Sequence, residues 1–188
     1  MIEPSPRADR PEREVSESVL LFLNAEMAQS FRSRLGLEAA QVELNFIGFT
    51  TGMRLATRLT ESRFPIMAER SAMRYVCKEV WAFLFRKPAD RLQTDRRGYY
   101  IIQDARFRWL EQLSPPPDGG RRGAGAHDAQ LHEAAALHLA LPCGLIRGVL
   151  MAVGIESTVT ADISVSELPA CSFTVGLKRP EEPPAAPP

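Results

Sequence analysis

Apolar residues in the first half of the chain recur every three or four positions, which is the spacing of amphipathic helices. This pattern predicts three helices before residue 88, where a proline ends the last of them. The first begins at Ser16 or Ser18 and carries Leu20, Leu23, Met27 and Phe31, the second covers residues 38–60, and the third covers residues 65–86 and buries Met73, Val76, Val80, Phe83 and Leu84.

The second predicted helix is apolar on two sides. One stripe consists of Val42, Phe46, Phe49 and Met53, and the other consists of Leu44, Ile47, Leu55 and Leu59. A helix with two apolar stripes needs two surfaces to pack against. We therefore expect one stripe to pack in the chain's own core and the other to contact a partner.

After residue 88 the period of the pattern drops to two, which is typical of strands. Gln93–Thr94 and Tyr99–Ile102 flank a turn at Asp95–Gly98, and together they predict a hairpin. Further strands are expected at residues 107–113, 156–165 and 171–177.

A fourth helix is predicted over residues 131–153, and Gly154 is placed to end it. Pro142 lies inside this span, so we expect it either to kink the helix or to begin a new one. The order of three helices, strands, one helix and strands is typical of an α+β fold, in which helices pack on one side of an antiparallel sheet.

Composition divides the chain into one domain and three segments of low complexity. Residues 1–17 are rich in Pro, Arg and Glu, and residues 179–188 are rich in Pro, so both are expected to be disordered tails. Residues 114–129 combine Pro with Gly and are predicted to form a long surface loop inside a single domain of residues 18–178.

Charge and cysteine content exclude some classes of protein. The chain carries 23 basic and 23 acidic residues, whereas a nucleic-acid binder has a basic excess. Three cysteines without paired spacing favour a reducing compartment, and the first residues lack the apolar stretch of a secretory signal. Leu137–Ile155 is interrupted by Pro142 and Arg147, so we expect it to be buried in protein. These features predict a cytoplasmic protein.

Side chains suited to catalysis or metal binding are sparse. His127, His132 and His138 lack the spacing of zinc ligands. Cys77 and Cys143 lie in apolar helical segments, where a thiol is usually inert, so a hydrolase that uses Cys143 is a disfavoured alternative. We expect no catalytic residue, no cofactor and no metal.

Two pairs of glycines lie four residues apart, Gly48 with Gly52 and Gly144 with Gly148. This spacing places both glycines of a pair on one helix face and lets another backbone approach closely. Packing between helices of the same chain is the favoured interpretation, and a partner helix or an apolar ligand remains the alternative.

Residues 86–108 have a basic bias, with seven basic and three acidic side chains. A basic hairpin could face anionic lipid, although a solvated surface explains the same bias and is favoured. The candidate membrane-facing residues are Arg91, Arg96, Arg97, Arg106 and Arg108.

Four segments together resemble a known family. They are GFTTGMRLATRL (48–59), YVCKEVWAFLFRK (75–87), DRLQTDRRGYYIIQD (90–104) and CGLIRGVLMAVGIESTVTA (143–161). Residues 18–177 resemble the small subunits of the transport protein particle, TRAPP, which share the Bet-three-like fold, and the combination is most similar to the subunit-six branch. The resemblance implies a helical layer packed on a twisted four-stranded antiparallel sheet.

The family resemblance also implies a function. It implies a non-catalytic scaffold that forms a heterodimer with TRAPP subunit three and joins other TRAPP subunits in a complex that tethers vesicles in ER-to-Golgi and intra-Golgi transport. Such a complex activates a Rab GTPase through other subunits and is peripheral to cis-Golgi and ER-Golgi membranes. Subunit three carries an acylated cysteine before its third helix, and the matching Ser62–Pro65 has none. The resemblance therefore implies no acylation site in this chain.

The two lines of reasoning meet at the second helix, whose extra stripe suits a dimer interface. The candidate interface residues are Leu20, Phe22, Leu23, Met27, Phe46, Phe49, Thr50 and Met53. Two alternatives remain: these residues pack only in the chain's own core, or the domain is a small-molecule or lipid-binding sensor of the same fold.

Overall fold

The computed structural model describes residues 16–59, 68–113 and 124–178. Residues 1–15 of the predicted tail 1–17, the predicted tail at residues 179–188, most of the predicted loop and the predicted start of the third helix at Pro65 lie outside these ranges. Glu17, the last residue of the predicted N-terminal tail, already belongs to the first helix. Within the predicted loop, residues 124–129 are helical, which corrects that part of the prediction. Residues that favour helix formation, such as Ala and Gln, extend the fourth predicted helix toward its N-terminus.

Two antiparallel helices open the described chain, α1 (Glu17–Leu35) and α2 (Leu37–Leu59). Gly36 joins them with a φ of 82°, a value that glycine adopts without strain. The amide of Gly36 donates to the carbonyl of Arg32 and closes the last turn of α1. Both predicted helices are therefore present.

The third helical segment is continuous but contains a π-turn. It consists of α3 (Glu69–Tyr75), the π-helical η1 (Val76–Val80) and α4 (Trp81–Phe85). A π-turn holds an extra residue, which rotates all later side chains around the axis. The buried face therefore continues through Trp81 and Phe85, while Phe83 is 48% exposed. The prediction that Phe83 is buried was wrong for this reason.

The four strands form one antiparallel sheet in the order β1-β2-β4-β3. Their bounds are Arg91–Thr94 for β1, Tyr100–Asp104 for β2, Ser157–Asp162 for β3 and Cys171–Leu177 for β4. The hairpin of β1 and β2 closes over Asp95, whose side chain accepts from the amides of Arg97 and Tyr99 at 2.8 Å each. The predicted hairpin is therefore confirmed.

Residues 107–113 do not form the strand that was predicted. They contain a short 3-10 helix, η2 (Arg108–Leu110), and a second one, η3 (Val165–Glu167), precedes β4. The amide of Leu110 donates to Phe107 and that of Leu113 donates to Leu110, so the chain turns every three residues. Phe107 and Leu110 are both fully buried. In an extended strand, side chains three positions apart would point to opposite faces, whereas the 3-10 turn places both on the same side.

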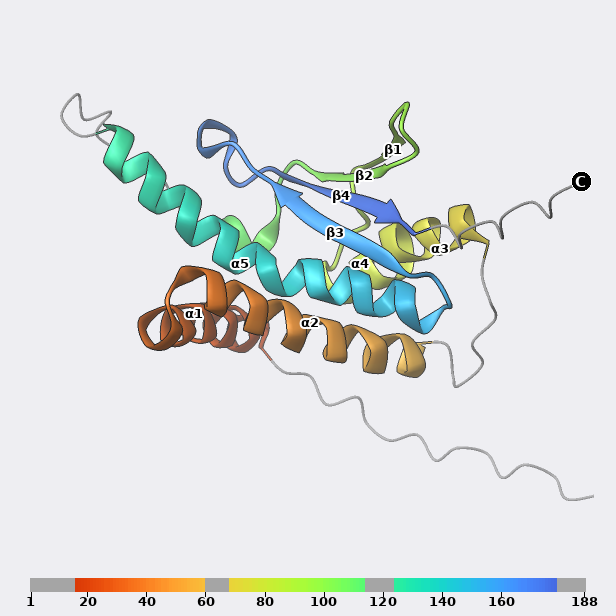
Figure 1. Cartoon of the computed structure of the whole chain (residues 1–188), viewed down its shortest axis with the longest axis horizontal. Coiled ribbons are helices and arrows are strands. Elements are labelled where there is room, and N and C mark those ends of the chain that lie inside the picture. The colour runs from red at the N-terminus through yellow and green to blue at the C-terminus, as the bar shows by residue number, and fades with distance from the viewer. Residues whose placement is uncertain (1–15, 60–67, 114–123, 179–188) are drawn as a thin grey trace, which may run out of the picture.

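The helix α5 (Ala124–Ala152) is the central element of the fold. Figure 1 shows it between the sheet and α2, with its axis bent along its length. The helix continues through Pro142, so the proline does not begin a new helix. Gly154 follows the end of α5 with a φ of 87°, as predicted for a terminating glycine.

Among the residues that the structure describes, helices cover one face of the sheet only. Ile102, Phe173 and Val175 point to the helices and are fully buried, while Thr158 and Thr160 on the alternate positions of β3 are exposed. Rings of Trp81, Phe85, Phe107, Trp109 and Phe173 pack together beneath the sheet. The α+β architecture with a helical layer on a four-stranded antiparallel sheet is thus confirmed.

Candidate functional site

The two glycine pairs face each other across the contact between α2 and α5. A Cβ atom added at Gly48 or Gly52 would lie less than 3 Å from a carbonyl oxygen of α5, and one added at Gly144 or Gly148 would meet a carbonyl oxygen of α2. The two backbones approach as closely as glycine alone allows. The glycine pairs therefore serve packing within the chain, the favoured interpretation.

The outer side of α2 is not covered by any other helix or strand that the structure describes. Among the residues predicted to pack in the core, Leu44 is fully buried and Ile47, Leu55 and Leu59 are partly buried. On the outer stripe, Val42 is 67% exposed, Phe46 57% and Met53 38%. We call Val42, Phe46, Phe49 and Met53 the outer stripe of α2.

The other two predicted interface residues of α2 are only partly exposed. Phe49 lies beneath a side chain of α5, and the hydroxyl of Thr50 donates to the carbonyl of Ile47 at 3.0 Å. Thr50 is therefore engaged with its own helix, whereas Phe46 and Met53 are open to contact.

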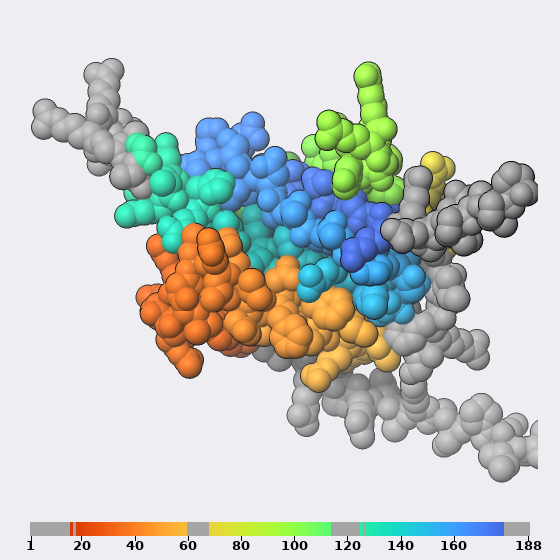
Figure 2. All heavy atoms as spheres, viewed as in Figure 1, coloured from red at the N-terminus to blue at the C-terminus, as the bar shows by residue number. Residues whose placement is uncertain are grey.

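The predicted interface residues of α1 lie mostly at the surface. Phe22 is 66% exposed, Leu23 52% and Leu20 40%, while Met27 packs partly against the core. Figure 2 shows α1 and α2 together forming one side of the molecule, opposite the hairpin. The structure therefore brings the apolar residues of both helices to the same layer.

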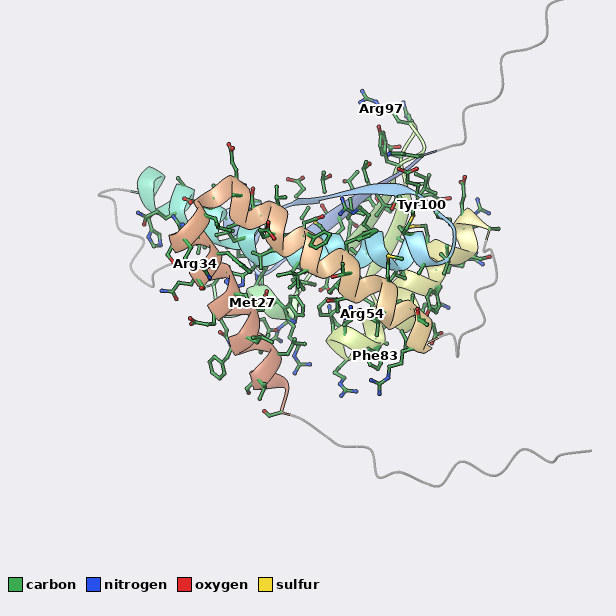
Figure 3. All side chains as sticks on the ribbon, turned by 60° about the horizontal axis from the view of Figure 1, so that its bottom comes forward. Met27, Arg34, Arg54, Phe83, Arg97 and Tyr100 are labelled. Atoms are coloured by element: carbon green, nitrogen blue, oxygen red, sulfur yellow. The ribbon has the colours of Figure 1, made fainter. Side chains whose placement is uncertain are left out.

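The structure adds a residue to this surface that the sequence pattern assigned to the core. Phe83 of α4 lines a groove of about 340 Å³ together with Val19, Leu20 and Leu23 of α1. Figure 3 shows Phe83 at the surface of the helical layer. A helical wheel with a constant period could not find it, because the π-turn changes the phase of the helix.

A second groove lies where the outer stripe of α2 meets α5. Arg147 of α5 places its Cζ atom 4.8 Å from the centroid of the Phe49 ring, a cation–π contact. The groove measures about 270 Å³ and is also lined by Met151, Ser157 and Lys178. It combines apolar walls with a cation at the edge of the candidate interface.

The predicted basic hairpin lies away from this helical face. Arg91, Arg96, Arg97 and Arg106 are exposed, and Figure 3 shows Arg97 at the tip of the hairpin. Arg106 forms an ion pair with Glu111 at 2.6 Å, and Arg108 is partly buried. The contact of the basic hairpin with lipid therefore stays a prediction.

All three thiols are buried. Burial raises the pKa of Cys77 to about 11 and that of Cys143 to about 12, and it raises the pKa of Cys171 further. A thiol that keeps its proton is a poor nucleophile. The environment of Cys143 therefore gives no support to the hydrolase alternative.

The histidines do not converge. His127 and His132 are exposed, whereas the Nδ1 atom of His138 lies 3.3 Å from the Nδ2 atom of buried Asn24. Burial lowers the pKa of His138. Within residues 16–59, 68–113 and 124–178, no group of three His, Cys, Asp or Glu side chains is placed to hold a metal.

The core beneath the sheet is closely packed in the described ranges. The apolar pocket between α4 and α5, beside Trp81 and Pro142, has a volume of about 10 Å³, close to that of one water probe. It cannot hold an acyl chain, so it does not favour the sensor alternative. The part of α5 from His127 to Ala152 is long and apolar enough to cross a membrane, but 72% of its most apolar window is buried within the protein.

The fold and this surface define a class of protein, an α+β domain whose helical layer leaves an apolar face uncovered. Comparison with known proteins supports this classification. A family model described as "Transport protein particle (TRAPP) component" matches residues 20–178. The chain therefore belongs to the TRAPP component family, as its sequence predicted.

Individual relatives point to subunit six within this family. Trafficking protein particle complex subunit 6b of Danio rerio is 35% identical over 167 residues, and subunit 6B of Homo sapiens is 36% identical over 170 residues. Each match covers 87% of this chain and 98% of the relative. The predicted similarity to the subunit-six branch is confirmed.

A solved structure shows the same fold. Trafficking protein particle complex subunit 3 from Naegleria fowleri, covalently bound to palmitic acid, matches with a TM-score of 0.63 at 15% identity. The match covers 87% of this chain and 98% of that chain.

Proposed function

We propose that the chain is a non-catalytic scaffold subunit of the TRAPP vesicle-tethering complex that forms a heterodimer through its helical face. The observation that carries this proposal is the outer stripe of α2, on which Phe46 is 57% exposed. Covering such aromatic and aliphatic side chains removes apolar surface from water, which drives association. The burial of the three thiols, which raises their pKa values, also supports a role without chemistry of its own.

Subunit three is the proposed partner. The family resemblance implies pairing between subunits six and three, and subunit 3 from Naegleria fowleri has a similar fold with a TM-score of 0.63. Two related folds can each present a helical layer, and together the layers can bury the ~800 Å² per partner of a standard interface.

Within the complete complex, the chain supports activation of a Rab GTPase by other subunits in ER-to-Golgi and intra-Golgi transport. It acts from the cytoplasm and reaches cis-Golgi and ER-Golgi membranes as part of the complex. Its balance of 23 basic and 23 acidic residues supports a role in protein assembly rather than in nucleic-acid binding.

Co-expression with a subunit-three homologue tests the proposal. We expect a stable one-to-one species by size-exclusion chromatography with light scattering. Replacing Phe46 by glutamate places a charge in the interface and should weaken binding by at least about tenfold, because aromatic anchors dominate interface energy. The fold should persist because Phe46 is exposed.

Tyr99→Glu is the matched control, since Tyr99 is an aromatic residue of the hairpin that is 41% exposed. It should bind subunit three as the unchanged chain does. Separate monomers on co-expression, or equal weakening by Phe46→Glu and Tyr99→Glu, would contradict pairing through the helical face.

A further inference from the structure

The groove beside Phe49 contains a cation without an acidic partner in the described chain. The guanidinium of Arg147 stacks on the Phe49 ring, and its Nε atom is buried without a hydrogen-bond partner. None of the ion pairs among the described residues involves Arg147. A partly buried cation of this kind is unusual, because charged groups away from water are normally paired.

A second polar group in the same groove also lacks a partner. Ser157 is 5% exposed, and its hydroxyl oxygen is buried without a hydrogen bond to the described chain. At the rim of the groove, Lys178 and Glu156 form an ion pair with each other. The two rim charges are therefore paired, whereas Arg147 has no acidic partner and the Ser157 hydroxyl has no hydrogen-bond partner among the described residues.

We propose that this groove receives an aspartate or glutamate side chain of the partner subunit, with Arg147 as its cation. The inference rests on the proposed heterodimer, because Phe49 belongs to the outer stripe of α2. A carboxylate accepts from the guanidinium, and a planar guanidinium can hold both of its oxygens. A backbone carbonyl would leave the charge of Arg147 unbalanced.

The walls of the groove strengthen such a pair. Phe49 lies against one face of the guanidinium, and Met151 contributes an apolar side chain that is 45% exposed. A partner that covers these side chains excludes water, and the attraction between the two charges rises as the local dielectric constant falls. A subunit without the carboxylate would bury the cation unpaired and be rejected, so the groove selects the partner.

Binding to the subunit-three homologue measures the contribution of Arg147. Arg147→Met keeps an unbranched side chain against Phe49 but removes the charge. We expect roughly thirtyfold weaker binding, mainly through faster dissociation, because a buried charge of the partner loses its counter-ion. Arg34→Met removes an exposed arginine of α1 (Figure 3) and should change affinity by less than about twofold.

A second variant identifies the carboxylate directly. Arg147→Lys puts a primary amine in the groove, and a carbodiimide condenses an amine with a contacting carboxylate into an amide while the reagent takes up the elements of water. We expect mass spectrometry to find a cross-link from position 147 to an aspartate or glutamate of the partner. The unchanged chain, treated in the same way, should lack it.

Two results would overturn the inference while leaving the heterodimer intact. One is equal affinity of Arg147→Met and Arg34→Met for the partner. The other is the absence of a cross-link at position 147 in a complex that cross-links at other lysines. Failure of the unchanged chain to bind subunit three would instead overturn the proposed function and this inference with it.

Discussion

At the scale of single residues, one buried carboxylate fixes the third helical segment to the sheet. Asp104 of β2 is 1% exposed and accepts from the indole of Trp81 at 2.9 Å and from the ammonium of Lys87 at 2.5 Å. The amide of Arg106 donates to the same side chain at 2.9 Å. A buried carboxylate is tolerated only when it is satisfied in this way.

Removing the counter-ion should therefore cost stability. We expect Lys87→Met to lower the free energy of unfolding by about 2 kcal/mol, less than for a fully buried pair because Lys87 is partly exposed. Urea unfolding of the isolated chain measures this loss.

A double-mutant cycle separates the pair from other effects. Asp104→Asn in the Lys87→Met background should cost at least about 1 kcal/mol less than the same change in the unchanged chain. Additive losses would show that Lys87 stabilises the fold by some route other than its contact with Asp104.

At the scale of elements, glycine sets the distance between α2 and α5. Glycine lowers helix stability by about 1 kcal/mol per residue relative to alanine. The backbones of α2 and α5 come close enough at Gly48, Gly52, Gly144 and Gly148 that any Cβ would collide with a carbonyl group. The close packing of the two helices offsets this cost and turns the outer stripe of α2 away from the core.

The same substitution should have opposite effects at two glycines of α5. Gly148→Ala forces the helices apart and should lower the free energy of unfolding by about 2 kcal/mol. Gly125→Ala meets no atom within 4 Å and should raise it by about 0.5 kcal/mol through helix propensity. Thermal and urea unfolding of both variants test this contrast, which would fail if Gly148→Ala proved neutral.

At the scale of the whole molecule, ionisable groups whose pKa is shifted by folding set the pH range of stability. Burial raises the pKa of Cys77 to about 11 and that of Cys143 to about 12, against an ordinary value of 9.0. Burial lowers the pKa of Lys87, but hydrogen bonds and charge interactions with Asp104 and Asp90 outweigh this effect, so the pKa of Lys87 is raised as well. A hydrogen bond from the amide of Ala105, together with Lys87, lowers the pKa of Asp90.

The directions of these pKa shifts define the pH range in which the protein is most stable. Groups with a raised pKa in the folded chain hold their protons more tightly than the unfolded chain does, so their contribution is complete below their ordinary pKa and is lost as pH rises. The contribution of Asp90 is present above its ordinary value of 3.8 and is lost as pH falls through the lowered one. Burial lowers the pKa of His138, so its contribution is likewise lost as pH falls below its ordinary value of 6.5. We expect the midpoint of urea unfolding to be constant between about pH 7 and pH 8, to fall as the pH decreases below about 6.5, and to fall above about pH 9.

Thiol labelling gives an independent check of the alkaline limit. The three cysteines should react slowly with a thiol reagent in the native chain and rapidly in urea. An unfolding midpoint that stays constant between pH 8 and about pH 10.5, or fast labelling of the native chain, would contradict the buried state of the thiols.

The amino-acid sequence by itself determined most elements of this protein. The two helices before residue 60, the hairpin at Asp95–Gly98, the long apolar helix and the final strand all follow from local periodicity and turn residues. The apolar outer stripe of α2 could also be read from the sequence, because residues three and four apart share a helix face whatever surrounds them.

Tertiary structure alone decided what each surface contacts. The π-turn at Val76–Val80 exposed Phe83, and the turn at Phe107 replaced a predicted strand. Trp81, which follows the π-turn, packs against Phe107, 26 positions further along the chain. The groove of Arg147, Ser157 and Phe49 joins residues from three elements. Such contacts depend on packing between segments far apart in the chain, and no local pattern encodes that packing.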